Sequence, residues 1–421
     1  MMKKEMSSFD DLSRRSFAEK TAAAALGLSL APTIDEAIAA SSVGKAKHVI
    51  YIYMGGGMTH LDTFDPKPGA ETQGKTGVIK TGVAGVQLSE YMPGLAKSFK
   101  DIAVVRSLTQ KTGSHGGASY WMQTGYKESA AIKHPNMGGW AQKALGKMHP
   151  QLPDTIYVGG GGGPGSGFLG ASYAPLPIGD PSKGLLNAKS PVPKPRMNQR
   201  LEALNGFNRS FLDKYHTDDV TAYSEFYDNT LEFLKGKDLD VFNLTKEKKE
   251  TRDAYGTSGF GQGLLLAKRL VKTGVRFVRV SNGGWDMHGD LWNRAPGKIN
   301  GFSKGIATLI NDLKAEGLFD STLIVLTTEF GRTPKINARG GRDHFPRCFS
   351  GMMAGGGIQG GQVYGATDSK GMGVKENPVA PDDFNATIAT ALGLPLEKRI
   401  FAPNGRPFFV SQGKPIQQLF S

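Results

Sequence analysis

The sequence predicts an α/β fold with a mostly parallel central sheet that is covered by helices on both faces. Short apolar runs recur along the chain, and segments with the 3.6-residue periodicity of helices alternate with them. Polar or glycine-rich clusters follow several of these runs. Strands that alternate with helices are typical of a parallel sheet whose two faces are both covered.

The apolar runs are the expected strands. The run 322–328 is rich in β-branched residues and ends abruptly at Glu329, as expected of a buried strand that opens into a site at the sheet's carboxyl edge. In chain order, strands are expected at residues 48–54, 102–106, 155–158, 275–280, 322–328 and 348–354.

Helical periodicity marks residues 224–234, 261–272, 301–316 and 382–392. For the last helix, Asp382 or Asp383 is the expected N-cap, and Gly393 before Pro395 is the expected stop.

Length and composition are consistent with one large α/β domain over residues 45–421. The apolar content of 39% is sufficient for a hydrophobic core. The 57 glycines cluster in loops and show no period, which excludes collagen-like and disordered chains. Residues 159–250, rich in glycine and proline and then in charge, are expected to form a loop-rich insertion or lid.

The N-terminus is typical of a twin-arginine signal peptide over residues 1–40. Arg14 and Arg15 precede a weakly apolar stretch, and small residues up to Ala40 offer a cleavage site. The alternative is a chance arginine pair before an alanine-rich helix. The signal predicts export of the folded protein to the periplasm or the cell exterior. No other segment approaches about 18 uninterrupted apolar residues, so no transmembrane segment is expected in the mature chain.

The chain is basic, with a net charge of +13 that becomes about +14 without the leader. A long-range positive field favours an anionic small molecule or polymer as partner, although solubility accounts for part of this charge. Nucleic acid is not expected, because the basic residues are dispersed and no nucleic-acid-binding motif is present. The oligomeric state does not follow from the sequence.

The chemistry-bearing residues follow the predicted strands. The single cysteine, Cys348, excludes an intrachain disulfide and a cysteine-based zinc cluster, so a metal would be held by histidines and carboxylates. Such donors suit a divalent ion such as Zn²⁺, Mn²⁺ or Fe²⁺, and they converge if the strands are neighbours. The candidate metal ligands are His60, Asp62, Asp286, His288, Glu329, Asp343 and His344.

Each candidate also has a structural interpretation. A histidine two residues from an aspartate is often only a hydrogen-bonded loop pair. Glu329 could form a salt bridge with Arg332. Arg106 and Arg332 could bind an anionic oxygen bidentately or only neutralise carboxylates. His134, His149 and His216 lie in polar loops and are expected to be bystanders.

Ser114 and His115 lie between glycines just before a helix-like segment. A nucleophile or metal ligand at a helix N-terminus gains from the positive end of the helix. The alternative is a serine N-cap beside a solvent-exposed histidine.

Taken together, the motifs resemble the bacterial family called domain of unknown function 1501. The resemblance rests on Gly-Gly-x-x-His-x-Asp-Thr-Phe-Asp-Pro, Ser-His-x-x-Ala, Gly-Trp-Asp-x-His, Thr-Glu-Phe-Gly-Arg-Thr-Pro and Gly-Arg-Asp-His, at residues 56–66, 114–118, 284–288, 328–334 and 341–344. It implies an alkaline-phosphatase-like, sulfatase-like fold.

In that superfamily a hydroxyl or formylglycine attacks phosphorus or sulfur beside one or two divalent ions. The resemblance implies zinc, manganese, calcium or magnesium as the ion. It places Ser114 or His115 at the nucleophile position, and it implies that Arg332 binds the transferred anion. Gly55 or Gly56 stands where an early metal-binding aspartate is expected. The surroundings of Cys348 lack the formylglycine motif.

The leading hypothesis is therefore an exported, metal-dependent hydrolase of phosphate or sulfate esters. The alternative is a non-catalytic envelope protein of the same fold that binds an anionic polymer or a protein partner.

Overall fold

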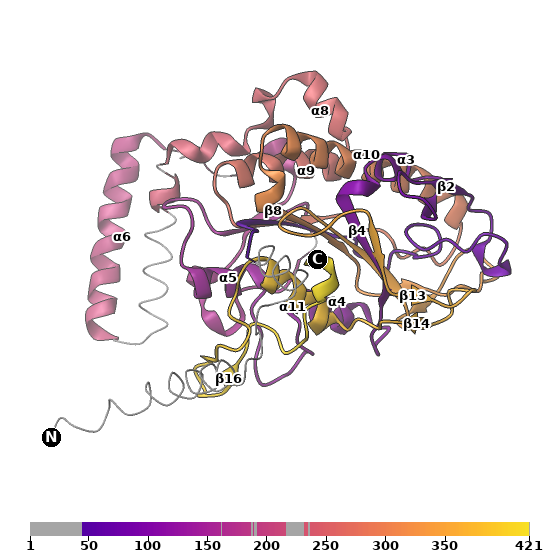
Figure 1. Cartoon of the computed structure of the whole chain (residues 1–421). Helices are drawn as coiled ribbons and strands as arrows, with labels where there is room; N and C mark the ends of the chain where they lie inside the picture. Colours follow the sequence, from indigo (N-terminus) through magenta and orange to yellow (C-terminus); the bar gives the residue numbers. More distant parts are fainter. Residues whose placement is uncertain are drawn as a thin grey trace, which may run out of the picture.

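The computed structural model describes residues 44–160, 162–186, 188, 192–215, 231–234 and 236–420 (Figure 1). One central sheet has the strand order β12-β4-β11-β8-β1-β7-β5-β6. Its strands are β1 (His48–Tyr53), β4 (Ile102–Leu108), β5 (Thr155–Val158), β6 (Leu176–Ile178), β7 (Phe277–Ser281), β8 (Thr322–Thr327), β11 (Phe349–Ala354) and β12 (Gln362–Tyr364).

Strand β11 runs antiparallel to both of its neighbours, β4 and β8. Every other pairing in the sheet is parallel. The predicted α/β class with a mostly parallel sheet is confirmed, and the six predicted strands all appear in it.

The helices lie on both faces of the sheet (Figure 1). Successive side chains of a strand point to opposite faces: Ile50 and Ile52 of β1 join one hydrophobic core, while Val49 and Tyr51 join the other. The first core packs against α3 (Pro93–Lys97), α9 (Gly259–Lys272) and α10 (Leu291–Ala315). The second packs against α4 (His115–Thr124), α5 (Met137–Leu145) and α11 (Pro381–Ala391).

Further elements lie outside the two layers. They include the helices α6 (Lys194–Lys214) and α8 (Lys249–Tyr255) and four two-stranded ribbons. The ribbons are β2 (Val78–Lys80) with β3 (Gln87–Ser89), β9 (Gly331–Arg332) with β10 (His344–Phe345), β13 (Ala366–Thr367) with β14 (Val374–Glu376), and β15 (Ile400–Phe401) with β16 (Pro407–Phe408).

Two predicted helices need correction at their starts. α10 begins at Leu291, ten residues before the expected start, because Leu291 and Ala295 already continue its buried face. The N-cap of α11 is Ala380, not Asp382 or Asp383. Asp383 instead accepts a hydrogen bond from the Ala380 amide at 3.2 Å.

The stop at Gly393 fits the structure, since its φ of 69° is the left-handed conformation that glycine favours. Most of the predicted helix 224–234 lies outside the described residues, as do His216 and the signal peptide residues 1–40.

Part of the expected insertion 159–250 belongs to the sheet itself, since β6 pairs with β5 at its edge. Within the part of the chain that the structure describes, no helix is both long and apolar enough to cross a membrane.

The topology determines which loops meet. β1 lies between β7 and β8 and is parallel to both. The segments that leave these three strands therefore emerge side by side at the carboxyl edge, which is where open α/β sheets place their sites.

Candidate metal centre

Asp286 lies at the centre of the cluster, in the loop that follows β7. The loop approaches the turn after β1 closely: a Cβ on Gly56, whose φ is 114°, would lie 2.6 Å from the Asp286 amide nitrogen. Only glycine allows this approach without displacing the loop.

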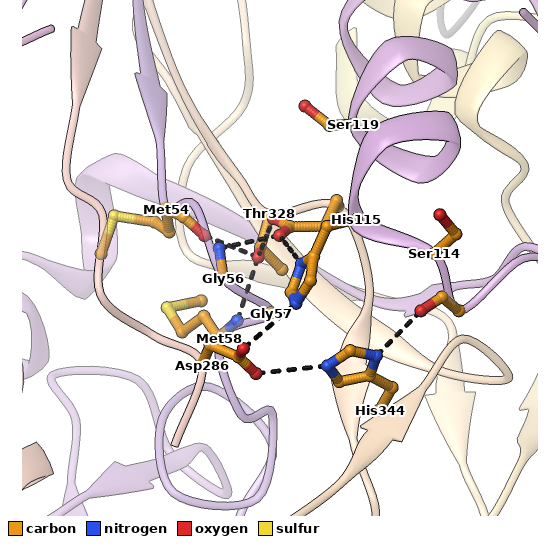
Figure 2. Close-up of polar contacts among 12 residues, drawn as sticks. Met54, Gly56, Gly57, Met58, Ser114, His115, Ser119, Asp286, Thr328 and His344 are labelled. Atoms are coloured by element: carbon orange, nitrogen blue, oxygen red, sulfur yellow. Dashed lines mark hydrogen bonds and ion pairs between the residues drawn. The ribbon is translucent and has the colours of Figure 1, made fainter. Parts of the chain in front are cut away.

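Three imidazoles surround the Asp286 carboxylate. The Nε2 atoms of His288 and His344 lie 2.9 Å and 3.2 Å from its Oδ1 atom. The Nε2 atom of His115 lies 3.5 Å from Oδ2. Figure 2 shows His115, at the start of α4, and His344, on β10, pointing toward Asp286 from different parts of the chain. The predicted candidates Asp286, His288 and His344 thus lie together, and His115 joins them.

The other ring nitrogen of each histidine is held by an oxygen acceptor. Nδ1 of His115 donates to Glu329 Oε1 at 2.7 Å. Nδ1 of His288 donates to Asp343 Oδ1 at 2.6 Å, and Nδ1 of His344 donates to the Gly113 carbonyl at 2.9 Å. With a cation at the centre, these acceptors would hold the proton on Nδ1 and leave the Nε2 lone pairs free to bind the ion. The same arrangement orients histidines that bind metals.

Two of the converging nitrogens have a further polar neighbour: Arg332 Nη1 lies 3.4 Å from Nε2 of His288, and Asp286 Oδ1 lies 3.2 Å from Nε2 of His344. Nε2 of His288 and Nε2 of His344 are 3.1 Å apart, so two lone pairs face each other unless a proton or a cation lies between them. Nε2 of His115 is buried and has no hydrogen-bond partner among the described residues. Ligand atoms of His115, Asp286 and His344 all lie within 4.8 Å of one another, as a shared ion requires.

Glu329 orients His115 and does not pair with Arg332. Its carboxylate, 2% exposed, accepts hydrogen bonds from the Gly56 amide at 2.7 Å and the Tyr53 hydroxyl at 3.0 Å. The alternative of a Glu329–Arg332 salt bridge is wrong, because Arg332 turns to a different carboxylate.

That carboxylate is Asp286, to which Arg332 Nη2 donates. The buried guanidinium also donates to the carbonyls of Gly56, Gly57 and Arg342. The predicted role of Arg332, binding of a transferred anion, does not fit this arrangement, because its N–H groups already donate to these oxygen atoms. Arg332 is a positioning residue for Asp286.

The two aspartates of the cluster are both held ionised. Burial opposes ionisation of Asp286, but the hydrogen bond and charge of Arg332, together with His344 and His288, outweigh it and lower the pKa of Asp286 to about 2. The hydrogen bond from His288 lowers the pKa of Asp343.

The pair His60 and Asp62 does not join this cluster. Asp62 is buried and forms an ion pair with Arg342 at 2.8 Å. It also accepts from Thr59 and Thr76. The ring of His60 is fully buried and contacts the Gly371 carbonyl at 3.0 Å, and this burial lowers its pKa. Both side chains have a structural role, but they do not form the expected loop pair, because each is held by other partners. Arg106 likewise lies 3.4 Å from Asp65 and neutralises it.

Ser114 is the N-cap residue of α4 but makes no capping hydrogen bond with its side chain. It is exposed, and Figure 2 shows its hydroxyl directed away from His344. The expected alternative, a serine N-cap beside an exposed histidine, is only half right, because His115 points into the cluster.

A cavity of about 690 Å³ opens onto the cluster. Some residues that line it were not predicted from the sequence, among them Ser119. Ser119 lies four residues after His115, and this spacing places both side chains on the same face of a helix. His134, expected to be a bystander, also lines the cavity. The side chains at its wall include Tyr53, His115, Ser119, Tyr120, Lys133, His134, Asp286 and Glu329.

Comparison with known proteins gave one family match. The model of the family described as "Protein of unknown function (DUF1501)" matches residues 46–420. A search of curated proteins found no match.

Several solved structures are similar at low identity. A sulfatase, PsFucS1 from Pseudoalteromonas sp., shares 14% identity, with 86% of this chain and 72% of that chain covered and a TM-score of 0.38. The phosphonate monoester hydrolase SpPMH from Silicibacter pomeroyi shares 12%, with coverage of 89% and 76% and a TM-score of 0.40. TAB5 alkaline phosphatase shares 11%, with coverage of 84% and 99% and a TM-score of 0.35.

Proposed function

This chain belongs to the DUF1501 family, and we propose that it is an exported, divalent-metal-dependent hydrolase of phosphate or sulfate esters. One observation carries the proposal: three histidine Nε2 atoms converge on the Asp286 carboxylate, and the Nδ1 atom of each ring is held by an acceptor. The cluster borders a cavity large enough for a small ester.

The donor set fits a divalent ion. His115, His288, His344 and Asp286 would hold it, and a cation there would relieve the opposed lone pairs of His288 and His344. Three imidazoles and one carboxylate suit zinc, manganese or iron, whereas calcium and magnesium take oxygen ligands. We therefore propose zinc, manganese or iron. When bound, the ion would supply Lewis-acid stabilisation of negative charge on the ester oxygens.

The residues of the chain would position this chemistry. Glu329 and Asp343 fix the ring orientations of His115 and His288, and Arg332 fixes Asp286. The exposed Ser114 does not fit the nucleophile role. We propose that water attacks the phosphorus or sulfur atom, that the bond to the ester oxygen breaks, and that the leaving alcohol takes up a proton.

A buried arginine beside the cavity, Arg279, favours an anionic substrate. Arg279 of β7 is 2% exposed, and no described carboxylate forms an ion pair with it. Its guanidinium lies between the rings of Tyr53 and Tyr157, 5.0 Å and 4.9 Å from their centroids, and donates to the Gly162 carbonyl at 2.9 Å. Tyr53 and Gly162 both line the cavity. An unneutralised buried charge beside a cavity favours an anion within it.

Export is proposed from the arginine pair at residues 14 and 15 and the small residues up to Ala40. The site would then act on esters in the periplasm or outside the cell.

The non-catalytic alternative has two observations in its favour. Arg332 is fully engaged, and Ser114 points away from the cluster. In that case the same cavity would bind an anionic polymer or protein partner without turnover.

A substrate panel separates the two functions. The purified mature protein, loaded in turn with zinc, manganese and iron, is assayed with 4-nitrophenyl phosphate, 4-nitrophenyl sulfate and a phosphonate monoester. Hydrolysis that disappears in Asp286→Ala but persists in the control His149→Ala would support the hydrolase. Stoichiometric metal without turnover of any substrate would favour the binding protein.

A further inference from the structure

A second cavity, of about 670 Å³, lies at the same edge of the sheet. Its walls come from the segments that follow β5, β6 and β7, from the N-terminus of α9 and from one face of α10. The loop after β7 contributes Gly283 to this cavity and Asp286 to the first, so one short loop lines both cavities.

Lys298 of α10 lines the second cavity and has no carboxylate partner among the described residues. Its ammonium nitrogen lies 5.1 Å from the ring centroid of Trp285, the residue before Asp286. Burial, assisted by the charge of Arg294, lowers the pKa of Lys298. An ammonium that is partly desolvated and unpaired is stabilised by any anion that reaches it.

Two polar side chains in the same wall also lack partners. Asn282 is only 9% exposed, and its side-chain amide makes no hydrogen bond to any described residue. The hydroxyl oxygen of Ser281 is buried and equally unpartnered within the described chain. Buried polar groups are rarely left unsatisfied, so the Ser281 hydroxyl indicates a polar occupant of the cavity.

The N-terminus of α9 supplies further donors. The Ser258 side chain accepts a hydrogen bond from the Gly261 amide at 3.2 Å. The amides of Gly259 and Phe260 donate to no group in the described parts of the chain. Free amides at the positive end of a 14-residue helix favour an anion.

The acidic residue at this wall is already engaged. Asp180 accepts from the amide and hydroxyl of Ser182 at 2.9 Å and 2.7 Å, and its carboxylate lies 3.8 Å from Lys183. The negative charge of Asp180 is therefore offset by these neighbours, whereas the positive charge of Lys298 has no such partner in the described chain.

We propose that this cavity binds a tetrahedral oxyanion, and that the oxyanion is a second phosphate or sulfate group of the substrate whose first group reaches the histidine cluster. The inference rests on the proposed function and narrows it: the substrate would carry at least two anionic groups, as a polysulfated or polyphosphorylated saccharide does.

Isothermal titration of the metal-loaded mature protein with inorganic sulfate, and separately with inorganic phosphate, tests the site directly. We expect two anions per chain in the wild type. Lys298→Met should weaken one binding event by at least about tenfold, because a charge-assisted hydrogen bond is lost. The matched control is Lys304→Met on the same helix, whose Nζ donates only to the Asp253 carbonyl and which should retain both events. Lys298→Gln, with thermal melting of each variant, guards against a folding defect.

The outcomes keep the two proposals apart. If anion binding in Lys298→Met equals that of the wild type, the second site does not exist. If Asp286→Asn loses one event and Lys298→Met the other, both sites are supported. If only the Lys298-dependent binding event occurs, the second site is supported. The histidine cluster then binds no anion, which contradicts the proposed function.

A disaccharide with two sulfate groups is then compared with its monosulfated counterpart. Tighter binding of the disulfated sugar by at least about tenfold, lost in Lys298→Met, supports a substrate that spans both cavities. Equal binding of the two sugars would indicate a site for free anions and would contradict the spanning substrate.

Discussion

Nδ1 of His115 lies 2.7 Å from Oε1 of Glu329, a contact that joins the first residue of α4 to the residue two beyond the end of β8. It selects the tautomer in which Nε2 of His115 is free to bind an ion. Because Glu329 is also held by the Gly56 amide, the same carboxylate ties His115 to the turn after β1.

Glu329→Gln should therefore weaken metal binding without removing a ligand. The neutral amide of glutamine lacks the negative charge with which Glu329 holds His115. Loss of a partner that orients a metal ligand typically lowers metal affinity by about 10–100-fold. Competition with a chelator measures this, with Glu376→Gln, an exposed site, as the control. Unchanged affinity in Glu329→Gln would mean that His115 is not a ligand.

Arg332→Met should destabilise the fold. The side chain is 1% exposed, and its loss leaves the carbonyls of Gly56 and Gly57 and the Asp286 carboxylate without their donor. Removing one partner of a buried pair costs about 3–5 kcal/mol, and the 45% exposure of Asp286 favours the lower end. Urea unfolding measures the free energy. Unaltered stability combined with a higher KM would instead support the original prediction that Arg332 binds the substrate anion.

Asp62→Asn should affect stability and leave the metal site intact. Asp62 and Arg342 are both nearly fully buried and lie 2.8 Å apart, so a loss of about 3 kcal/mol or more in unfolding free energy is expected. The variant should bind as much metal as the wild type. A parallel loss of metal in a variant that remains folded would place Asp62 among the ligands.

Metal affinity should fall as the pH falls from 8 to 5. The pKa of Asp286, lowered to about 2, keeps this carboxylate ionised across that range. Protons therefore compete with the ion only at the imidazoles, which must be neutral to bind. Asp286→Asn should lower the affinity at every pH while the slope of affinity against pH stays the same. A shallower slope in the variant would show that Asp286 itself takes up a proton between pH 5 and 8.

The sequence was sufficient to predict the sheet and to name the four residues of the cluster, with His115 as a nucleophile or metal ligand. Asp286, His288 and His344 could be identified because buried parallel strands deliver the residues that follow them to one edge. His344 reaches the centre through the short pairing of β10 with β9, in which it lies opposite Arg332.

The remainder depended on packing between distant loops. The Arg332 guanidinium donates hydrogen bonds to the backbone carbonyls of residues 56, 57 and 342. A backbone acceptor cannot be recognised from a pattern of side chains in the sequence. Asp62 and Asp286 look alike in sequence, each near a histidine, and each pairs with a buried arginine. Asp62 is nearly fully buried against Arg342, whereas Asp286 stays half exposed and also faces three histidines. The direction of the Ser114 hydroxyl depends on how α4 begins, which periodicity does not fix.

The most direct test of the account is the metal content of the purified mature protein, measured by elemental analysis after loading with zinc, manganese or iron and removal of excess ion. We expect one ion per chain in the wild type and in His149→Ala, and none in His288→Ala, His344→Ala or Asp286→Ala. A wild type that holds no metal under any loading condition, or an Asp286→Ala variant that keeps its ion, would contradict the proposed centre.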